Sequence, residues 1–119
     1  MKAILVTLLF SCFGFADNLL DGKSFTGDIV HGKDKEKDTL VFKEGKFHST
    51  SCDKYDYKDA AYKAAKKGEL IAFEAETAND SGDKIQWKGT VKGTTVEAKG
   101  VRTNGSEKMG EMTFKGKSN

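Results

Sequence analysis

The stretch Asp83 to Val91, DKIQWKGTV, decides the fold. Its side chains alternate between two faces, and one face carries Ile85, Trp87, Gly89 and Val91. A period of two with one apolar face is typical of a β-strand that is buried on one side. The same period recurs before and after this stretch, so most of the chain is predicted to be a series of such strands.

The predicted strands follow one another closely and are separated by turn residues. They cover 24–30, 39–43, 46–52, 70–77, 83–92, 95–102 and 108–115. Glu44-Gly45 and Asn104-Gly105 are predicted to be tight turns. Because every connection is local, the sequence predicts an all-β fold, an antiparallel up-and-down meander of about eight strands that closes into a small barrel.

Residues 53–67 are open to two interpretations. Alanines and lysines favour a helix, and Gly68 stands where the cap of a helix would stand. The passage through Lys67-Gly68 into the next strand favours a hairpin instead. The strand is preferred, because an open sheet would otherwise leave an edge uncovered. The alternative is a short helical lid over 56–67 at the mouth of the barrel.

The first sixteen residues have the features of a secretory signal peptide. Lys2 supplies a positive charge, Ala3 to Phe10 is almost entirely apolar, and Gly14-Phe15-Ala16 offers small residues for cleavage. The apolar run is shorter than the about 20 residues of a transmembrane helix. We therefore expect 17–119 to be a single exported domain, periplasmic or secreted, without a membrane span.

The two cysteines raise separate questions. Leu9-Phe10-Ser11-Cys12 resembles a lipobox, so lipidation of Cys12 and anchoring to a membrane surface is the alternative to simple cleavage. Cys52 is expected to be a free, buried thiol. His48 is placed on the same side of the same predicted strand, with about 13 Å between the two Cα atoms. That separation is too large for a nucleophile and its base.

The charges exclude one class of partner. They make up 32% of the chain, carry a net charge of +2 and interleave both signs, so there is no basic stripe for nucleic acid. The densest run, Lys33 to Asp38, alternates in sign and is predicted to be a solvated loop. The sequence contains no Ser–His–Asp set with interpretable spacing, no phosphate loop and no metal-ligand repeat. We therefore expect no enzymatic activity, no metal and no cofactor.

Several short motifs resemble a group of small exported bacterial proteins of uncharacterised function. They are Phe47-His48-Ser49 with Cys52, then Tyr62, Phe73-Glu74-Ala75-Glu76 and Trp87-Lys88-Gly89. The resemblance spans most of residues 20–116 and implies an architecture similar to lipocalin-like (calycin) barrels. It implies no activity, and the amino-terminal Gly-x-Trp of lipocalins is absent.

The ligand-binding residues predicted from the sequence are Trp87, Arg102, Phe73 and Tyr62. Arg102 is the only arginine and falls on the predicted inner face, where it can hold a carboxylate as a fork or stack on Trp87; the alternative is that it points into solvent. The inward aromatic residues either fill the core or line a lumen. We expect a binding module for a small apolar or amphipathic ligand. The alternative is a non-catalytic cell-envelope interaction or inhibitor protein with a filled core.

Overall fold

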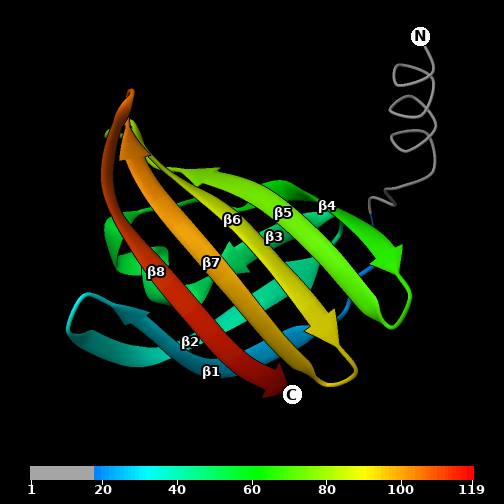
Figure 1. Ribbon diagram of the computed structural model, residues 1–119. Helices are drawn as coiled ribbons and strands as arrows, with labels where there is room; N and C mark the ends of the chain where they lie inside the picture. The colour runs from blue at the N-terminus through cyan, green and yellow to red at the C-terminus, as the bar shows by residue number, and fades with distance from the viewer. Residues whose placement is uncertain (1–17) are drawn as a thin grey trace, which may run out of the picture.

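The computed structural model describes residues 18–119, which form one closed antiparallel barrel (Figure 1). The strands are β1 (Ser24–His31), β2 (Asp34–Lys43), β3 (Lys46–Ser49), β4 (Ala60–Lys67), β5 (Leu70–Ala78), β6 (Asp83–Lys92), β7 (Thr95–Asn104) and β8 (Glu107–Ser118). A short 3₁₀ helix, η1 (Thr50–Tyr55), follows β3. Neighbours in sequence pair in space and β1 pairs with β8, so the predicted eight-stranded meander and its closure are confirmed. The predicted signal peptide and Cys12 lie outside the described residues.

The charged run from Lys33 to Asp38 is not a loop, as the sequence analysis predicted, because most of it belongs to β2. β1 and β2 continue to a tight turn at Gly32, whose φ is 62°. Cross-strand charge pairing explains the extension. The Asp28 carboxylate lies 3.1 Å from the Lys37 ammonium and 3.7 Å from that of Lys35.

The third predicted strand, 46–52, ends early at Ser49, and the chain turns into η1. Phe47 and Ser49 face the interior, so His48 faces outward. Cys52 belongs to η1 and is buried. The expectation that His48 and Cys52 share one face of a strand is therefore wrong.

The segment that was open to two interpretations is a strand over Ala60–Lys67. It pairs with β5 from Tyr62 to Lys67, with Tyr62 opposite Ala75 and Ala64 opposite Phe73, while Ala60 and Ala61 pair with β3. The helical lid over 56–67 is wrong, because this segment is needed to link β3 to β5 in the closed sheet. The helical element of the structure is η1, which lies earlier in the chain, at Thr50–Tyr55.

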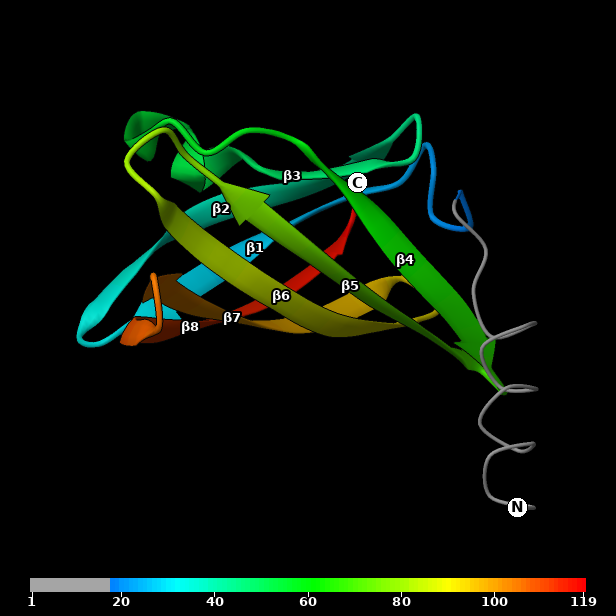
Figure 2. The same cartoon turned by 90° about the horizontal axis from the view of Figure 1, so that it is seen from above.

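The two ends of the barrel differ. The end that we call the mouth carries the β1–β2 turn, η1, the 79–82 loop and the β7–β8 turn, and Figure 2 shows η1 and the β1–β2 turn at the same end. At the opposite end, Leu20 is fully buried and its backbone N–H donates to the Tyr62 hydroxyl at 2.8 Å. That hydroxyl donates to Asp21 Oδ1 at 2.9 Å. Residues 18–23 thus plug this closed end.

Aromatic rings fill the interior next to the closed end. The Phe42 ring is central, with its centroid 4.9 Å from that of Tyr62 and 5.0 Å from that of Phe73. Phe47 continues the cluster and lies 5.3 Å from Trp87. Such tilted and edge-on contacts add to the stabilisation that burial of the rings provides.

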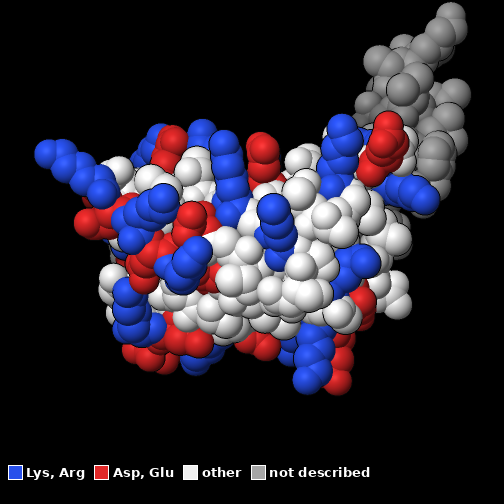
Figure 3. Space-filling model, turned by 90° about the horizontal axis from the view of Figure 1, so that it is seen from below, with Lys and Arg blue, Asp and Glu red and all other residues white. Residues whose placement is uncertain are grey.

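The outer surface carries both signs of charge. Figure 3 shows lysines and acidic side chains interleaved on the face seen from below, with an uncharged area between them. Within residues 18–119, no helix has the length and apolar character required to cross a bilayer.

The barrel closes where β1 and β8 approach each other at Gly27 and Gly116, which are paired. A Cβ atom built on Gly27 would lie 1.9 Å from the carbonyl oxygen of Lys115 and 2.4 Å from the Gly116 Cα. Both neighbours are backbone atoms, so they cannot give way as a side chain would. Glycine is therefore required at this seam.

We predict that Gly27→Ala lowers the free energy of unfolding by at least about 2 kcal/mol, because the added methyl group overlaps backbone of the paired strand. The neighbouring outward residue provides a control, Thr26→Ser, which should change it by less than about 1 kcal/mol. Urea unfolding of both variants measures the difference. Equal stability of the two variants would show that the seam is not tightly closed.

Candidate ligand site at the mouth

A cavity of about 380 Å³ opens at the mouth. Its apolar wall comes from β1, β6 and β8 through Ile29, Ile85 and Met112. Its polar lining residues include Cys52, Tyr57 and Arg102. The volume falls within the range of small-molecule sites, which combine an apolar lining with a few polar groups.

Residues 50–59, which we call the lid segment, form one side of this cavity. They contribute Ser51, Cys52, Tyr55 and Tyr57 to its lining. Asn79 Nδ2 donates to the Tyr55 carbonyl at 3.0 Å, and the Lys58 N–H donates to the Ala78 carbonyl at 3.1 Å. The lid segment is thereby joined to the end of β5.

Asp38 is only 2% exposed, and it holds the start of the lid segment in place. Its carboxylate accepts hydrogen bonds from the Ser49 hydroxyl at 2.6 Å and the Ser51 N–H at 2.8 Å. The Thr50 hydroxyl donates to it at 3.3 Å. A buried carboxylate needs such donors, and here they turn the chain out of β3.

His48 contacts two residues of the lid segment on the outer side of the barrel. Its Nε2 lies 2.7 Å from Asp53 Oδ1, within η1, and its Nδ1 lies 3.2 Å from Asp59 Oδ1, just before β4. The imidazole is therefore engaged on both nitrogens with two acidic residues of the lid segment. It has no part in the cavity, and it faces away from Cys52.

Cys52 is a buried thiol in the cavity lining. Burial raises its pKa, with the nearby Asp38 charge adding to the rise and hydrogen bonding with Ser49 opposing it. The thiol therefore stays protonated near neutral pH. Since the thiolate is the reactive form, this environment does not favour Cys52 as a nucleophile.

Arg102 faces the cavity from β7, as the alternation with Ala98 and Gly100 predicted. It pairs with Ile85 on one side and with Gly110 on the other. A bulge follows it, since the register shifts between Arg102 and Thr103. Bulges commonly redirect side chains beside binding sites. Here the extra residue is Met109, which lines the mouth and is 47% exposed.

Three buried side-chain polar atoms within residues 18–119 have no hydrogen-bond partner: Tyr57 OH, Thr77 Oγ1 and Trp87 Nε1. Native proteins satisfy the large majority of such atoms, so each exception requires an explanation. Tyr57 lines the cavity directly. Thr77 is paired with Ile85, itself a lining residue, and Trp87 is two residues further along β6. Of the three atoms, only that of Tyr57 belongs to a residue that lines the cavity.

The structure separates the four residues proposed from sequence. Trp87 and Phe73 lie in the packed interior, each in ring contact with Phe47. Tyr62 lies at the closed end, where its hydroxyl is hydrogen-bonded to Leu20 and Asp21. Arg102 alone of the four lines the mouth cavity.

The register also decides between the two inward roles considered for Arg102. Gly100, rather than Arg102, lies opposite Trp87. Among the described residues, the cation–π contact is Lys54 over Tyr55, at 5.6 Å. Arg102 therefore lines the cavity and does not stack on the Trp87 ring.

Asp38 was missed, and Tyr57 was not among the proposed ligand-binding residues. Asp38 shares the phase of Leu40 and Phe42, so extending the period of two backwards along β2 would have placed it inside. Tyr57 lies in an irregular stretch before β4, where periodicity carries no signal.

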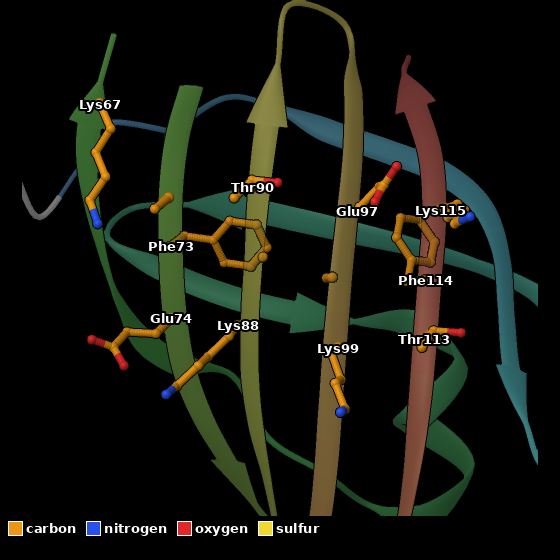
Figure 4. Close-up of a pocket in the computed structure, with 13 residues that line it drawn as sticks. Lys67, Phe73, Glu74, Lys88, Thr90, Glu97, Lys99, Thr113, Phe114 and Lys115 are labelled. Carbon is orange, nitrogen blue, oxygen red and sulfur yellow. The ribbon is translucent and has the colours of Figure 1, made fainter. Parts of the chain in front are cut away.

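A second concavity, about 660 Å³, lies on the outer face of β5–β8 (Figure 4). Its side chains alternate in charge, since Glu74 is paired with Lys88 and Glu97 with Lys115. Phe73 and Phe114 are buried under its floor. None of the three unpartnered buried atoms lines it, so it is the weaker candidate for a small-molecule site.

Within the part of the chain that the structure describes, no three or more His, Cys, Asp or Glu side chains gather in a group that could hold a metal ion. Comparisons with protein-family models, with curated proteins and with solved structures give no match. The resemblance to small exported proteins with calycin-like barrels therefore stays a prediction. The fold and the mouth cavity carry the functional argument.

We predict that Asp38→Ala lowers the free energy of unfolding by about 3 kcal/mol, because it leaves the buried donors of Ser49 and Ser51 without an acceptor. Asp34→Ala, at the exposed start of the same strand, is the matched control and should cost less than about 0.5 kcal/mol. Chemical denaturation followed by circular dichroism compares them. Similar midpoints would mean that Asp38 does not anchor the lid segment.

Proposed function

We propose that this protein is an exported, non-catalytic binding module that takes a small amphipathic molecule into the mouth of its barrel. The observation that carries the proposal is the mouth cavity, with its apolar wall and the unpartnered hydroxyl of Tyr57. Barrels of about eight strands have interiors that are either filled or wide enough for one small ligand. This barrel combines a filled half with an open half.

The chemistry of the cavity supports an amphipathic ligand rather than a purely apolar one. Ile29, Ile85 and Met112 offer apolar surface to a hydrocarbon or ring. Tyr57 and Arg102 offer hydrogen-bond donors within the same space. At the entrance, Tyr55 and Met109 are about half exposed, at 51% and 47%, and extend the apolar surface outward.

Export rests on the signal-like residues 1–16, with lipidation of Cys12 as the alternative route to a membrane surface. In either case we place the barrel outside the cytoplasm.

The second candidate function is an interaction or inhibitor module of the cell envelope. The aromatic packing around Phe42 favours it, since a filled half-barrel resembles a rigid scaffold more than a container. The outer concavity over β5–β8 would then be the contact surface. This function predicts a protein partner and no uptake of small apolar molecules.

The mature protein should bind the neutral fluorescent probe N-phenyl-1-naphthylamine, with an increase in the emission of the probe as it enters the apolar mouth. Met112→Trp should abolish at least about nine-tenths of this increase, because the larger ring occupies the cavity. Thr113→Trp adds the same ring to the outer face of the same strand and should leave binding unchanged.

Thermal melts of both variants establish that each is folded before binding is measured. Failure of the wild-type protein to bind the probe would count against the proposed function. So would equal binding by the Met112→Trp and Thr113→Trp variants, since the probe would then sit elsewhere.

A further inference from the structure

Arg102 is a cation without a counter-ion. It is half-buried in the cavity lining, and among residues 18–119 it makes no ion pair or hydrogen bond through its side chain. An arginine in such a position normally forms a fork with a carboxylate, since its planar donors match that geometry. The position of Arg102 therefore leaves these donors available to a group that enters the mouth.

The acidic side chains in the lining do not supply that group. The Glu36 carboxylate lies 2.9 Å from the Lys54 ammonium and 3.2 Å from His31 Nε2. Both contacts lower the pKa of Glu36, and the hydrogen bond with Lys54 has the larger effect. Glu111 is engaged by Lys108 and Lys99, which likewise lower its pKa. Both carboxylates are thus already matched by cations on the rim.

Asp83 is a further acidic group near this wall, and it makes a hydrogen bond rather than an ion pair. Its Oδ1 accepts a hydrogen bond from Asn104 Nδ2 at 2.7 Å, across the β6–β7 pair. Asn104 is neutral, so Asp83 keeps its charge, but none of these three carboxylates forms an ion pair with Arg102 within residues 18–119.

There is open space at the strand position opposite Arg102. The residue opposite Arg102 on β8 is Gly110, and a Cβ atom built there would meet nothing within 4 Å. On the other side lies Ile85, part of the apolar wall. A ligand head group at this point can therefore contact Arg102 while its body lies along Ile85.

Tyr57 provides a second donor to the same space. Its residue is 6% exposed, and its hydroxyl has no partner among the described residues. Burial raises the pKa of this hydroxyl, as does the charge of Asp83, while the charge of Arg102 lowers it. The net rise keeps the proton in place near neutral pH, so the hydroxyl is able to donate. Arg102 and Tyr57 both line this cavity.

We propose that the ligand is an amphipathic carboxylate whose head group is bound jointly by the Arg102 guanidinium and the Tyr57 hydroxyl, with its apolar body against Ile29, Ile85 and Met112. This inference rests on the proposed function and adds the charge and the orientation of the ligand to it. The head group lies on the β6–β7–β8 wall of the mouth. The aromatic cluster around Phe42 stays outside the site.

Two probes that share one apolar chain separate the two proposals: decanoate, which carries the carboxylate, and 1-decanol, which does not. Isothermal titration calorimetry should show the mature protein binding decanoate at least about tenfold more tightly than 1-decanol. Arg102→Gln should weaken decanoate binding roughly 10- to 100-fold, the cost of a lost charge-assisted pair. Tyr57→Phe should weaken it about fivefold.

The controls use the same assay. Thermal melts establish that Arg102→Gln and Tyr57→Phe are folded, and Arg102→Gln should weaken decanoate binding more than it weakens 1-decanol binding. Lys35→Gln removes an exposed lysine of the β1–β2 hairpin that does not line the cavity, and it should leave decanoate binding unchanged.

The outcomes distinguish the two levels of the argument. If the wild-type protein binds 1-decanol as tightly as decanoate, or if Arg102→Gln and Lys35→Gln have equal effects, the carboxylate proposal is overturned and the binding module remains. If neither probe binds, both proposals are overturned.

Discussion

The packing of aromatic rings around Phe42 determines how the interior of this barrel is divided. Phe42 contacts Phe25, Phe47, Tyr62 and Phe73, and together these rings occupy the half next to the closed end. Leu20 is fully buried at that end and closes it. Eight strands cannot enclose much more than such a cluster, so whatever space remains must lie at the other end. There the inward side chains are Ile29, Ile85 and Met112, which leave the cavity partly open.

A single buried carboxylate shapes that open end. Asp38 collects donors from three consecutive residues, 49–51, and so ends β3 after four residues. The chain then crosses the mouth as the lid segment before it rejoins the sheet at Ala60. Without this turn, β3 would continue and Cys52 and Tyr57 would not reach the cavity. The site thus depends on a polar interaction placed where the alternation of β2 would normally put an apolar side chain.

Much of this architecture was predictable because side-chain alternation is a local property. The period of two around Trp87 located the strands and their inner faces, and short turns implied a meander, while the direction of Arg102 at the end of its strand stayed open. The rest depends on contacts between distant residues. The end of β3 requires Asp38 to meet residues 11 to 13 positions away, and the plug requires Leu20 to meet Tyr62, 42 positions away. Neither pairing leaves a local pattern, and the placement of Tyr57 follows from both η1 and its link to β5.

The central claim is that one half of the interior is filled and the other half binds. Methyl-resolved NMR of the protein during titration with 1-decanol tests it most directly. The methyl resonances of Ile29, Ile85 and Met112 should shift in a saturable manner, while those of Leu20, Val91 and Val96 at the filled end stay in place. Shifts that appear at Leu20 and Val96, or that leave Ile29 and Ile85 unaffected, would contradict the account.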